Sequence, residues 1–323
     1  AILAAVQMAP KRLGLKDGVK PHLIISAIEH PAITECARSL EREERATVTE
    51  VGVDAWGRVR PDEIVAALRP ETALVSIMHA NNEVGTVQPI SSISRAVRAA
   101  SPSVLVHTDA AQSVGKVCVS APDLGVDMLT LVGHKFGAPK GVAALYVRAG
   151  LELPNLLRGG GQESGRRAGT ECVPLIVGLG EACAIWMEQG AEIACHSASM
   201  RDRMLAGLES ELGTDRLRVN SPLAFGPDDA TGSWPALPNV LSVGVRNIQS
   251  GNVLGTLVDT VAASAGAACH SGGGVSGVLG QLKVPAEYAL GTLRLSVGRH
   301  TTPEEVDKAV RLIASAIRAQ PTW

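Results

Sequence analysis

The sequence predicts an α/β fold whose main sheet is largely parallel and covered by helices on both faces. Short, continuously apolar segments, such as residues 73–78, alternate with amphipathic helical segments, such as residues 92–100, through the first half of the chain. Continuous apolar strands are typical of parallel sheets because both faces are buried. The alternation stops near Gln189, which indicates a large domain over residues 1–189 and a smaller α+β domain over residues 190–323.

The elements of the first half follow from local signals. Residues 1–6 are typical of the middle of a helix, and the first strand ends at Glu29-His30-Pro31. Pro61 stands at the first position of a short helix, where its missing N–H costs nothing. The expected strands are residues 22–28, 47–51, 73–78, 104–107, 129–132 and 142–147, and the expected helices are residues 31–41, 61–68 and 92–100.

The second half contains fewer strands and a different order of elements. Thr302-Pro303-Glu304-Glu305 favours a helix start, because it combines a capping hydroxyl, a proline and early acids. The expected helices are residues 192–212, 251–258 and 302–319, and the expected strands are residues 240–245 and 292–297, with one more strand before a glycine-rich segment at 266–277.

Composition excludes several classes of protein. With 323 residues, 46% hydrophobic and 19% charged, the chain is globular. Net charge is −2 without a basic cluster, and no apolar run reaches membrane-spanning length, so we expect neither a nucleic-acid partner nor a membrane partner. The scattered cysteines indicate reduced thiols and an intracellular, cytoplasmic location. An organelle is the alternative, because the chain begins at Ala1 without a secretory signal and we expect its true N-terminus upstream.

Polar residues gather just past the ends of the expected strands. His30, Asn82, Asp109, Gln112 and the pair His134-Lys135 all occupy such positions. Ligands of open α/β sheets bind at the carboxyl ends of the strands. The sequence therefore predicts a binding site at this edge. The histidines form no HExxH motif, so we expect no metal there.

Lys135 and Asp109 are the pair that a pyridoxal phosphate (PLP) site needs. A lysine forms a Schiff base with this cofactor, and a carboxylate pairs with the ring nitrogen. Lys135 follows an apolar strand and a glycine, so we expect it to be buried, with a lowered pKa. The alternatives are a surface lysine and, for Asp109, a carboxylate that only caps a turn.

The other strand-end residues each have two interpretations. His30 stacks on the cofactor ring and moves protons, or is an ordinary loop residue. His134 donates to the phosphate, or is a satisfied histidine at a strand end. Asn82 and Gln112 donate hydrogen bonds to the phenolic oxygen of the ring, or are turn residues.

The triplet Cys-His-Ser occurs twice, at Cys195 and Cys269. Cys195 lies in an amphipathic helix, so we expect a small structural core residue. Cys269 lies in a glycine-rich segment beside a histidine, so we expect a reactive thiol. Arg294, on a strand with alternating polar residues, is suited to bind a substrate carboxylate, with a surface arginine as the alternative.

Together these motifs resemble the cysteine desulfurases and selenocysteine lyases of the class V aminotransferase family, which are PLP enzymes of fold type I. The resemblance is strongest to the selenocysteine lyases and spans nearly the whole chain in order. It is carried by Glu29-His30, His79-Ala-Asn-Asn-Glu-Val-Gly85, His107-Thr-Asp-Ala-Ala-Gln-Ser-Val-Gly-Lys116, Gly133-His-Lys135, Gly159-Gly-Gly-Gln-Glu163, Arg167-Ala-Gly-Thr-Glu171, Gly266-Ala-Ala-Cys-His-Ser271 and Leu293-Arg-Leu-Ser-Val-Gly-Arg-His-Thr-Thr302.

The resemblance implies a role for each candidate residue. Cys269 accepts sulfur or selenium from L-cysteine or L-selenocysteine, Arg294 binds the substrate carboxylate, and Thr170 reaches the phosphate of the other subunit of a homodimer. The long spacing from Cys269 to Arg294 resembles the branch that passes sulfur to an acceptor protein. The cofactor is held by Lys135, Asp109, Gln112, Asn82, His134 and His30.

The chain also departs from the family pattern. Family members carry a further segment upstream, with a Gly-Thr-Glu phosphate loop and the first strand of the sheet, so we expect the large domain to lack that strand and its neighbour to be unpaired. Val132 also replaces a phosphate-binding serine of many desulfurases. Two alternative functions stay open: another class V reaction, such as an aminotransferase, and a truncated, inactive homologue that acts as a dimerising scaffold.

Overall fold

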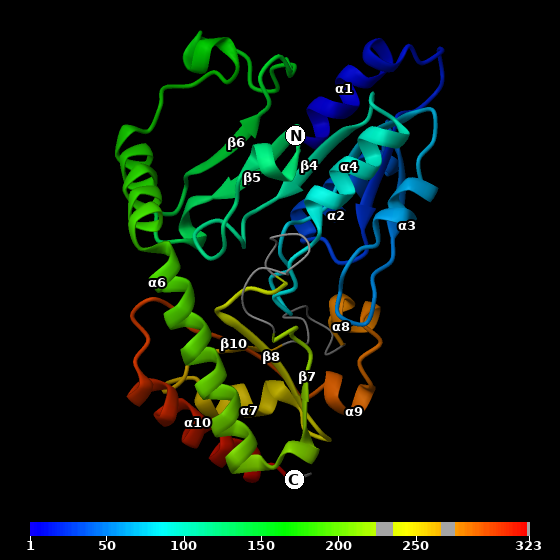
Figure 1. Cartoon of the computed structure of the whole chain (residues 1–323). Helices are drawn as coiled ribbons and strands as arrows, with labels where there is room; N and C mark the ends of the chain where they lie inside the picture. Colours follow the sequence, from blue (N-terminus) through cyan, green and yellow to red (C-terminus); the bar gives the residue numbers. More distant parts are fainter. Residues whose placement is uncertain (224–234, 266–274, 322–323) are drawn as a thin grey trace. The chain divides into compact units, whose positions relative to one another are not determined.

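The computed structural model describes residues 1–223, 235–265 and 275–321, and these residues form two compact units (Figure 1). The first unit comprises residues 1–53, 59–80 and 88–188. The second comprises residues 189–323 together with two short segments, Asp54–Arg58 and Asn81–Val87. The sequence assigned both segments to the large domain, because each connects elements of that domain along the chain.

The first unit is built on a six-stranded sheet. Its order is β2 (Thr47–Val51), β1 (His22–Ser26), β3 (Thr72–Ser76), β4 (Leu105–Asp109), β5 (Met128–Val132) and β6 (Ala143–Val147). The first five strands are parallel, and β6 pairs antiparallel with β5 at the edge. The predicted α/β fold with a mainly parallel sheet is confirmed.

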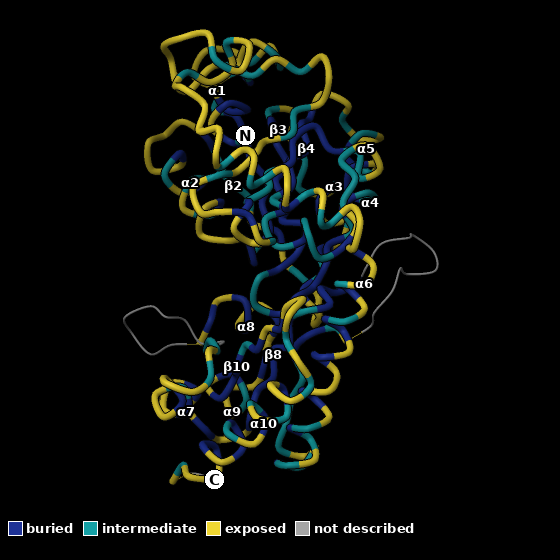
Figure 2. Tube along the Cα trace, turned by 90° about the vertical axis from the view of Figure 1, so that its left-hand side faces the viewer, coloured by how far each residue is buried: buried dark blue, intermediate teal, exposed yellow. Residues whose placement is uncertain are grey.

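Helices cover both faces of this sheet, because side chains alternate along each strand. Leu23 of β1 packs in one apolar cluster with α1 (Ile2–Leu13) and α2 (Pro31–Arg42). The next residue, Ile24, packs in another cluster with α3 (Pro61–Ala66) and α4 (Ile90–Ala100). Figure 2 shows β3 and β4 as buried between exposed connections. The central strands β1 and β3 are therefore buried on both faces, which is typical of a parallel sheet covered by helices.

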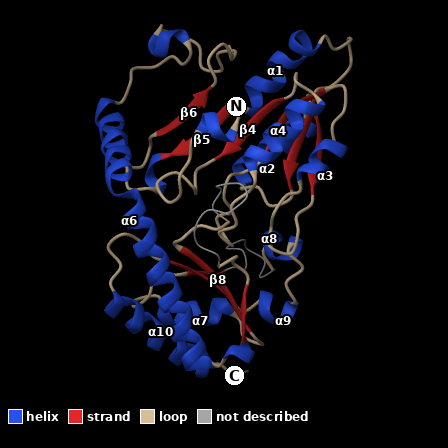
Figure 3. Cartoon of the chain, in the orientation of Figure 1, coloured by secondary structure: helices blue, strands red, loops and turns tan. Residues whose placement is uncertain are grey.

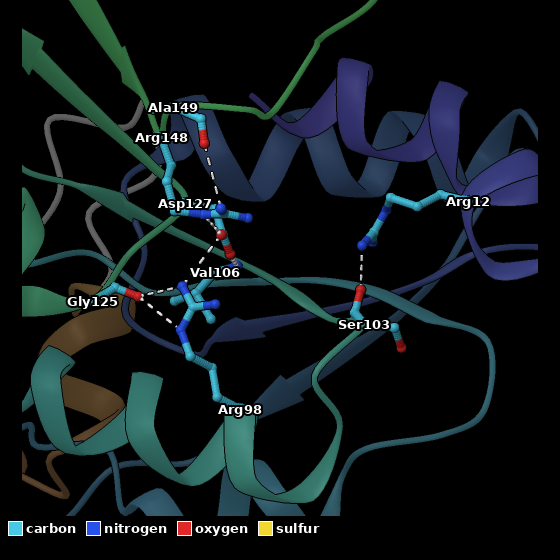
Figure 4. A network of polar contacts seen from close by, with 8 residues as sticks. All are labelled: Arg12, Arg98, Ser103, Val106, Gly125, Asp127, Arg148 and Ala149. Carbon is cyan, nitrogen blue, oxygen red and sulfur yellow. Dashed lines mark hydrogen bonds and ion pairs between the residues drawn. The ribbon is translucent and has the colours of Figure 1, made fainter.

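A buried carboxylate fixes the amino-terminal edge of the sheet (Figure 4). Asp127 directly precedes β5 and is 1% exposed. Its Oδ2 accepts the Val106 N–H at 2.8 Å, while its Oδ1 accepts from Arg148 at 2.7 Å and from Arg98 at 3.2 Å. Arg12 of α1 donates to the main-chain oxygen of Ser103 near the same edge. Asp127 thus joins β4, β5, α4 and the residue after β6.

The second unit contains a four-stranded antiparallel sheet (Figure 3). Its order is β7 (Leu217–Val219), β8 (Val240–Val245), β10 (Thr292–Ser296) and β9 (Ser264–Ala265). Its core joins β8 and β10 to α7 (Ser250–Leu257), α10 (Pro303–Arg318) and the end of α6 (Val173–Leu212). The shorter helices are α5 (Ala121–Leu124), α8 (Gly277–Gln281) and α9 (Ala286–Ala289).

Two sequence predictions about α6 differ from the structure. The helix begins at Val173, well before the predicted residue 192. Gly178 and Gly180, together with exposed apolar residues, hide the helical period in its first part. Cys195 does lie on this helix, but it is exposed rather than in the core. No helix among the described residues combines the length and apolarity that crossing a bilayer requires.

Candidate active site

The candidate lysine stands on a short 3₁₀ turn, η1 (Gly133–Lys135), that follows β5 directly. A Cβ on Gly133 would lie 2.9 Å from the Cβ of Ala138 and 3.0 Å from Val142, so only glycine fits this turn. His134 and Lys135 are both exposed. The prediction of a buried lysine was wrong, because the turn carries Lys135 beyond the last layer of sheet side chains.

Asp109 is the last residue of β4 and is half-buried. Its Oδ1 accepts the Ala111 N–H at 2.9 Å. Burial raises the pKa of this carboxyl group, and the hydrogen bond from Ala111 and the charge of His30 oppose that rise. A cationic N–H donor beside Asp109 would therefore stabilise its ionised form.

His30 is the N-cap of α2 and faces the same edge. Its Nδ1 accepts the Ala32 N–H at 3.1 Å. The neutral ring therefore carries its proton on Nε2. The ends of β1 and β4 lie at the same edge of the parallel sheet, where a protonated His30 would act electrostatically on Asp109.

Gln112, Lys116 and Lys135 form a second group at this edge. The Lys116 ammonium donates to the Gln112 carbonyl oxygen at 2.8 Å and lies 3.4 Å from its Oε1. Burial, followed by the positive charge of Lys135, lowers the pKa of Lys116 to about 8. A Cβ on Gly115 would lie 2.2 Å from the Cβ of Phe136, so this glycine lets the two turns pack together. Its φ of +76° also favours glycine.

Two buried side chains, His79 and Glu29, form hydrogen bonds near the carboxyl edge of the sheet. The His79 Nδ1 is 2.8 Å from the Ser113 hydroxyl, and burial lowers the pKa of His79 to about 4. Glu29 lies between Ser26 and Met78 and accepts hydrogen bonds from both. Neither Glu29 nor Lys116 was assigned a role from the sequence. Both stand in the quoted segments, at Glu29-His30 and at Gly115-Lys116, and this position was the signal that could have identified them.

Asn82 and Arg294 meet in the second unit. Arg294 on β10 donates to the Asn82 carbonyl oxygen at 3.0 Å and to the Ser264 hydroxyl at 3.1 Å. Asn82 meets this arginine through its main chain. The two partners orient the Arg294 guanidinium, and three of its N–H groups are not used by these bonds.

Thr170, which the resemblance assigned to the phosphate, belongs to neither cluster. Thr170 is exposed in the segment between η2 (Gln162–Gly165) and α6. Cys269 lies outside the described residues. Within residues 1–223, 235–265 and 275–321, no group of three histidine, cysteine or acidic side chains is arranged to hold a metal ion.

The residues of the first unit fit PLP. Asp109 is a poorly solvated carboxylate with one hydrogen bond to its Oδ1, so a protonated ring nitrogen suits it as a partner. Lys135 presents an exposed amine one strand away, since β4 and β5 are neighbours in the sheet. Gln112 lies in the turn that follows β4. A mostly parallel sheet with this lysine turn and this strand-end aspartate defines the α/β class of PLP enzymes of fold type I.

The chain belongs to the class-V aminotransferase family, whose profile matches residues 3–309. It is 42% identical over 316 residues to a selenocysteine lyase of Bos taurus, covering 93% of this chain and 70% of the relative. It is 37% identical over 308 residues to the cysteine desulfurase IscS of Clostridium botulinum, covering 94% and 74%. A solved NifS-like protein superimposes with a TM-score of 0.85 at 33% identity, covering 99% of this chain and 79% of the neighbour. Enzymes of this family depend on PLP.

Proposed function

We propose that this protein is a PLP-dependent enzyme that removes sulfur or selenium from L-cysteine or L-selenocysteine and releases L-alanine. The family membership and the activities named for its relatives support this function. The observation that carries it is that His30, Asp109, Gln112 and Lys135 all lie at or just past the carboxyl ends of strands β1, β4 and β5 of one sheet.

When bound, PLP supplies an electron sink that labilises the bonds at the α-carbon of an attached amino acid. Lys135 would hold the cofactor through its amine and then move the proton at the substrate α-carbon. Asp109 would accept a hydrogen bond from the ring nitrogen and keep that nitrogen protonated. Gln112 and Asn82 would donate to the phenolic oxygen, His134 would donate to the phosphate, and His30 would stack on the ring.

Arg294 would hold the substrate carboxylate with the N–H groups that Asn82 and Ser264 leave available. Cys269 would attack the sulfur or selenium atom of the substrate as a thiolate. A bond forms between the Cys269 sulfur and that atom, the bond from that atom to the β-carbon breaks, and the β-carbon takes a proton to give alanine. The resulting persulfide or selenopersulfide is suited to transfer to an acceptor protein.

A homodimer is part of this proposal. The first unit exposes apolar side chains that are unusual on a monomer surface, and Met187 is 83% exposed. A second copy of the chain would cover them and would bring its Thr170 to the phosphate. The exposed group comprises Leu156, Leu157, Val173, Ile176, Val177 and Met187.

The proposal is tested with the purified full chain and added PLP. We expect the visible absorption of a lysine-bound cofactor in the wild type, and its loss in Lys135→Ala. The matched control is Lys140→Ala, an exposed lysine beyond the same turn. Cys269→Ser should keep the absorption and lose alanine release, because the variant lacks the thiol that accepts sulfur or selenium. An aminotransferase would not need this thiol, so the result separates the two functions. A colourless wild-type protein, or alanine release that survives Cys269→Ser, contradicts the proposal.

A side-by-side assay of alanine release from cysteine and selenocysteine then defines the substrate preference. Light scattering of the same preparations measures the oligomeric state. We expect a dimer, and a monomer that still binds PLP would contradict the part assigned to Thr170.

A further inference from the structure

Glu29 is a buried acid that joins two strand ends beneath the candidate site. Its side chain stands three residues after β1, and the residue is 7% exposed. The Ser26 hydroxyl donates to its Oε1 at 2.5 Å, and the Met78 N–H donates to the same oxygen at 2.9 Å. Because Met78 follows β3, one oxygen atom connects the chain after β1 with the chain after β3.

The second carboxyl oxygen of Glu29 has a different environment from the first. Among the described residues, Oε2 is buried and has no hydrogen-bond partner. Burial, with a further contribution from the charge of Asp109, raises the pKa of Glu29 to about 8. The carboxyl group is therefore mostly neutral at pH 7. A buried acid with one unpartnered oxygen costs stability, so stability alone does not explain its presence.

The neighbours of Glu29 are residues of the candidate site. Asp109 is the charged group that acts on Glu29, and Ser26 and Met78 supply neutral donors. His30 follows Glu29 in the chain, caps α2, and acts electrostatically on Asp109. A displacement of the Glu29 side chain would therefore move His30 with respect to Asp109.

We propose that Glu29 is a positioning residue of the PLP site, which clamps the end of β1 to the end of β3 and thereby fixes His30 beside Asp109. The clamp works through Oε1. A neutral Glu29 places no second negative charge beside Asp109, whose ionised form is the one that a protonated ring nitrogen requires. This inference rests on the proposed function, since it concerns the same cofactor.

The test measures the affinity of cofactor-free protein for PLP at pH 7, from visible absorption during titration. Glu29→Ala removes both hydrogen bonds of the clamp, and Ser26→Ala removes the one from the Ser26 hydroxyl. Glu29→Gln keeps an acceptor oxygen for both donors. Glu41→Gln is the matched control, because Glu41 is an exposed acid on α2. Circular dichroism and the urea midpoint report the folding of each variant.

We expect Glu29→Ala to weaken PLP binding about tenfold or more and Ser26→Ala to weaken it about fivefold, the effect of one lost hydrogen bond. Glu29→Gln and the control should stay within about threefold of the wild type, because their donors and acceptors are kept. Rescue by glutamine separates positioning from a merely structural role, which would move the urea midpoint and leave the affinity unchanged.

The inference is overturned if folded Glu29→Ala and Ser26→Ala both bind PLP like the wild type. Should Glu29→Ala fail to fold, Ser26→Ala alone decides. A wild type that binds no PLP refutes the proposed function and this inference together. If the wild type binds PLP and the folded variants bind it equally well, this inference is refuted and the proposed function is not.

Discussion

Glu29 predicts an unusual dependence of stability on pH. Its pKa is raised from 4.5 to about 8 in the folded protein by burial. Below pH 4.5 the group is protonated in both states. As the pH rises from 4.5 to 8, the unfolded chain releases this proton and the folded chain keeps it, so the free energy of unfolding falls. Above pH 8 both states are ionised and the loss levels off.

The size of the loss follows from the difference between the folded and unfolded pKa values of Glu29. A pKa difference of one corresponds to about 1.4 kcal/mol, so Glu29 lowers the unfolding free energy by up to about 5 kcal/mol between pH 4.5 and 8. Glu29→Gln cannot ionise and lacks this slope. His79 and His107, whose pKa values burial lowers to about 4 and about 3, destabilise the protein as the pH falls below 6.5. Their effect is equal in both proteins and cancels in the difference.

The assay is urea unfolding of cofactor-free wild type and Glu29→Gln from pH 5 to 9. The chain has two compact units, so the unfolding transition of each unit is fitted separately. Hydrogen exchange of peptides from β1 identifies the unfolding transition of the first unit. We expect the stability of the variant relative to the wild type to increase steadily up to pH 8. A difference that stays constant to within about 1 kcal/mol would show that Glu29 is already ionised in the fold and would refute the reasoning.

Two further substitutions test the two edges of the sheet. Asp127→Asn should lower the unfolding free energy by about 3 kcal/mol in urea titrations, because it removes a buried charge that two arginines and one N–H share. An unchanged midpoint would contradict this. Gly115→Ala places a methyl group 2.2 Å from Phe136 and should weaken PLP binding about tenfold or more by displacing the turn beside Lys135. Wild-type affinity in that variant would mean that the turn adapts.

The sequence predicted most of the strands, because short runs rich in β-branched and apolar residues are bounded by turn residues. The predicted bounds of β2 and β8 are those of the structure. The first part of α6 was missed, since helical periodicity identifies a helix only when one face is buried in its own chain. Residues 173–188 expose apolar side chains instead, and the proposed second copy of the chain would cover them.

The positions of the candidate site residues at one edge of the sheet were predicted from the sequence, and their roles in the reaction stay predictions. Strand ends indicated Asp109 and Lys135, because every parallel strand delivers its last residue to the same edge. The exposure of Lys135 depends on one 3₁₀ turn, and the grouping of Asn82 with the second unit depends on contacts far apart in the sequence. Neither property is a local feature of the chain, so motif and spacing cannot reveal it.

The amino-terminal and carboxyl edges of the six-stranded sheet differ in how well their buried acids are hydrogen-bonded, and this difference shows which edge stabilises the fold. Both oxygens of Asp127 accept bonds from cationic or main-chain donors, so its charge stabilises the fold. At the other edge, one oxygen of Glu29 is unpartnered, and the half-buried ammonium of Lys116 feels the positive charge of Lys135. Both groups carry a perturbed pKa and cost stability. Unsatisfied or strained ionisable groups on a stable scaffold are typical of functional positions, so these two groups favour the carboxyl edge of the sheet as the candidate site.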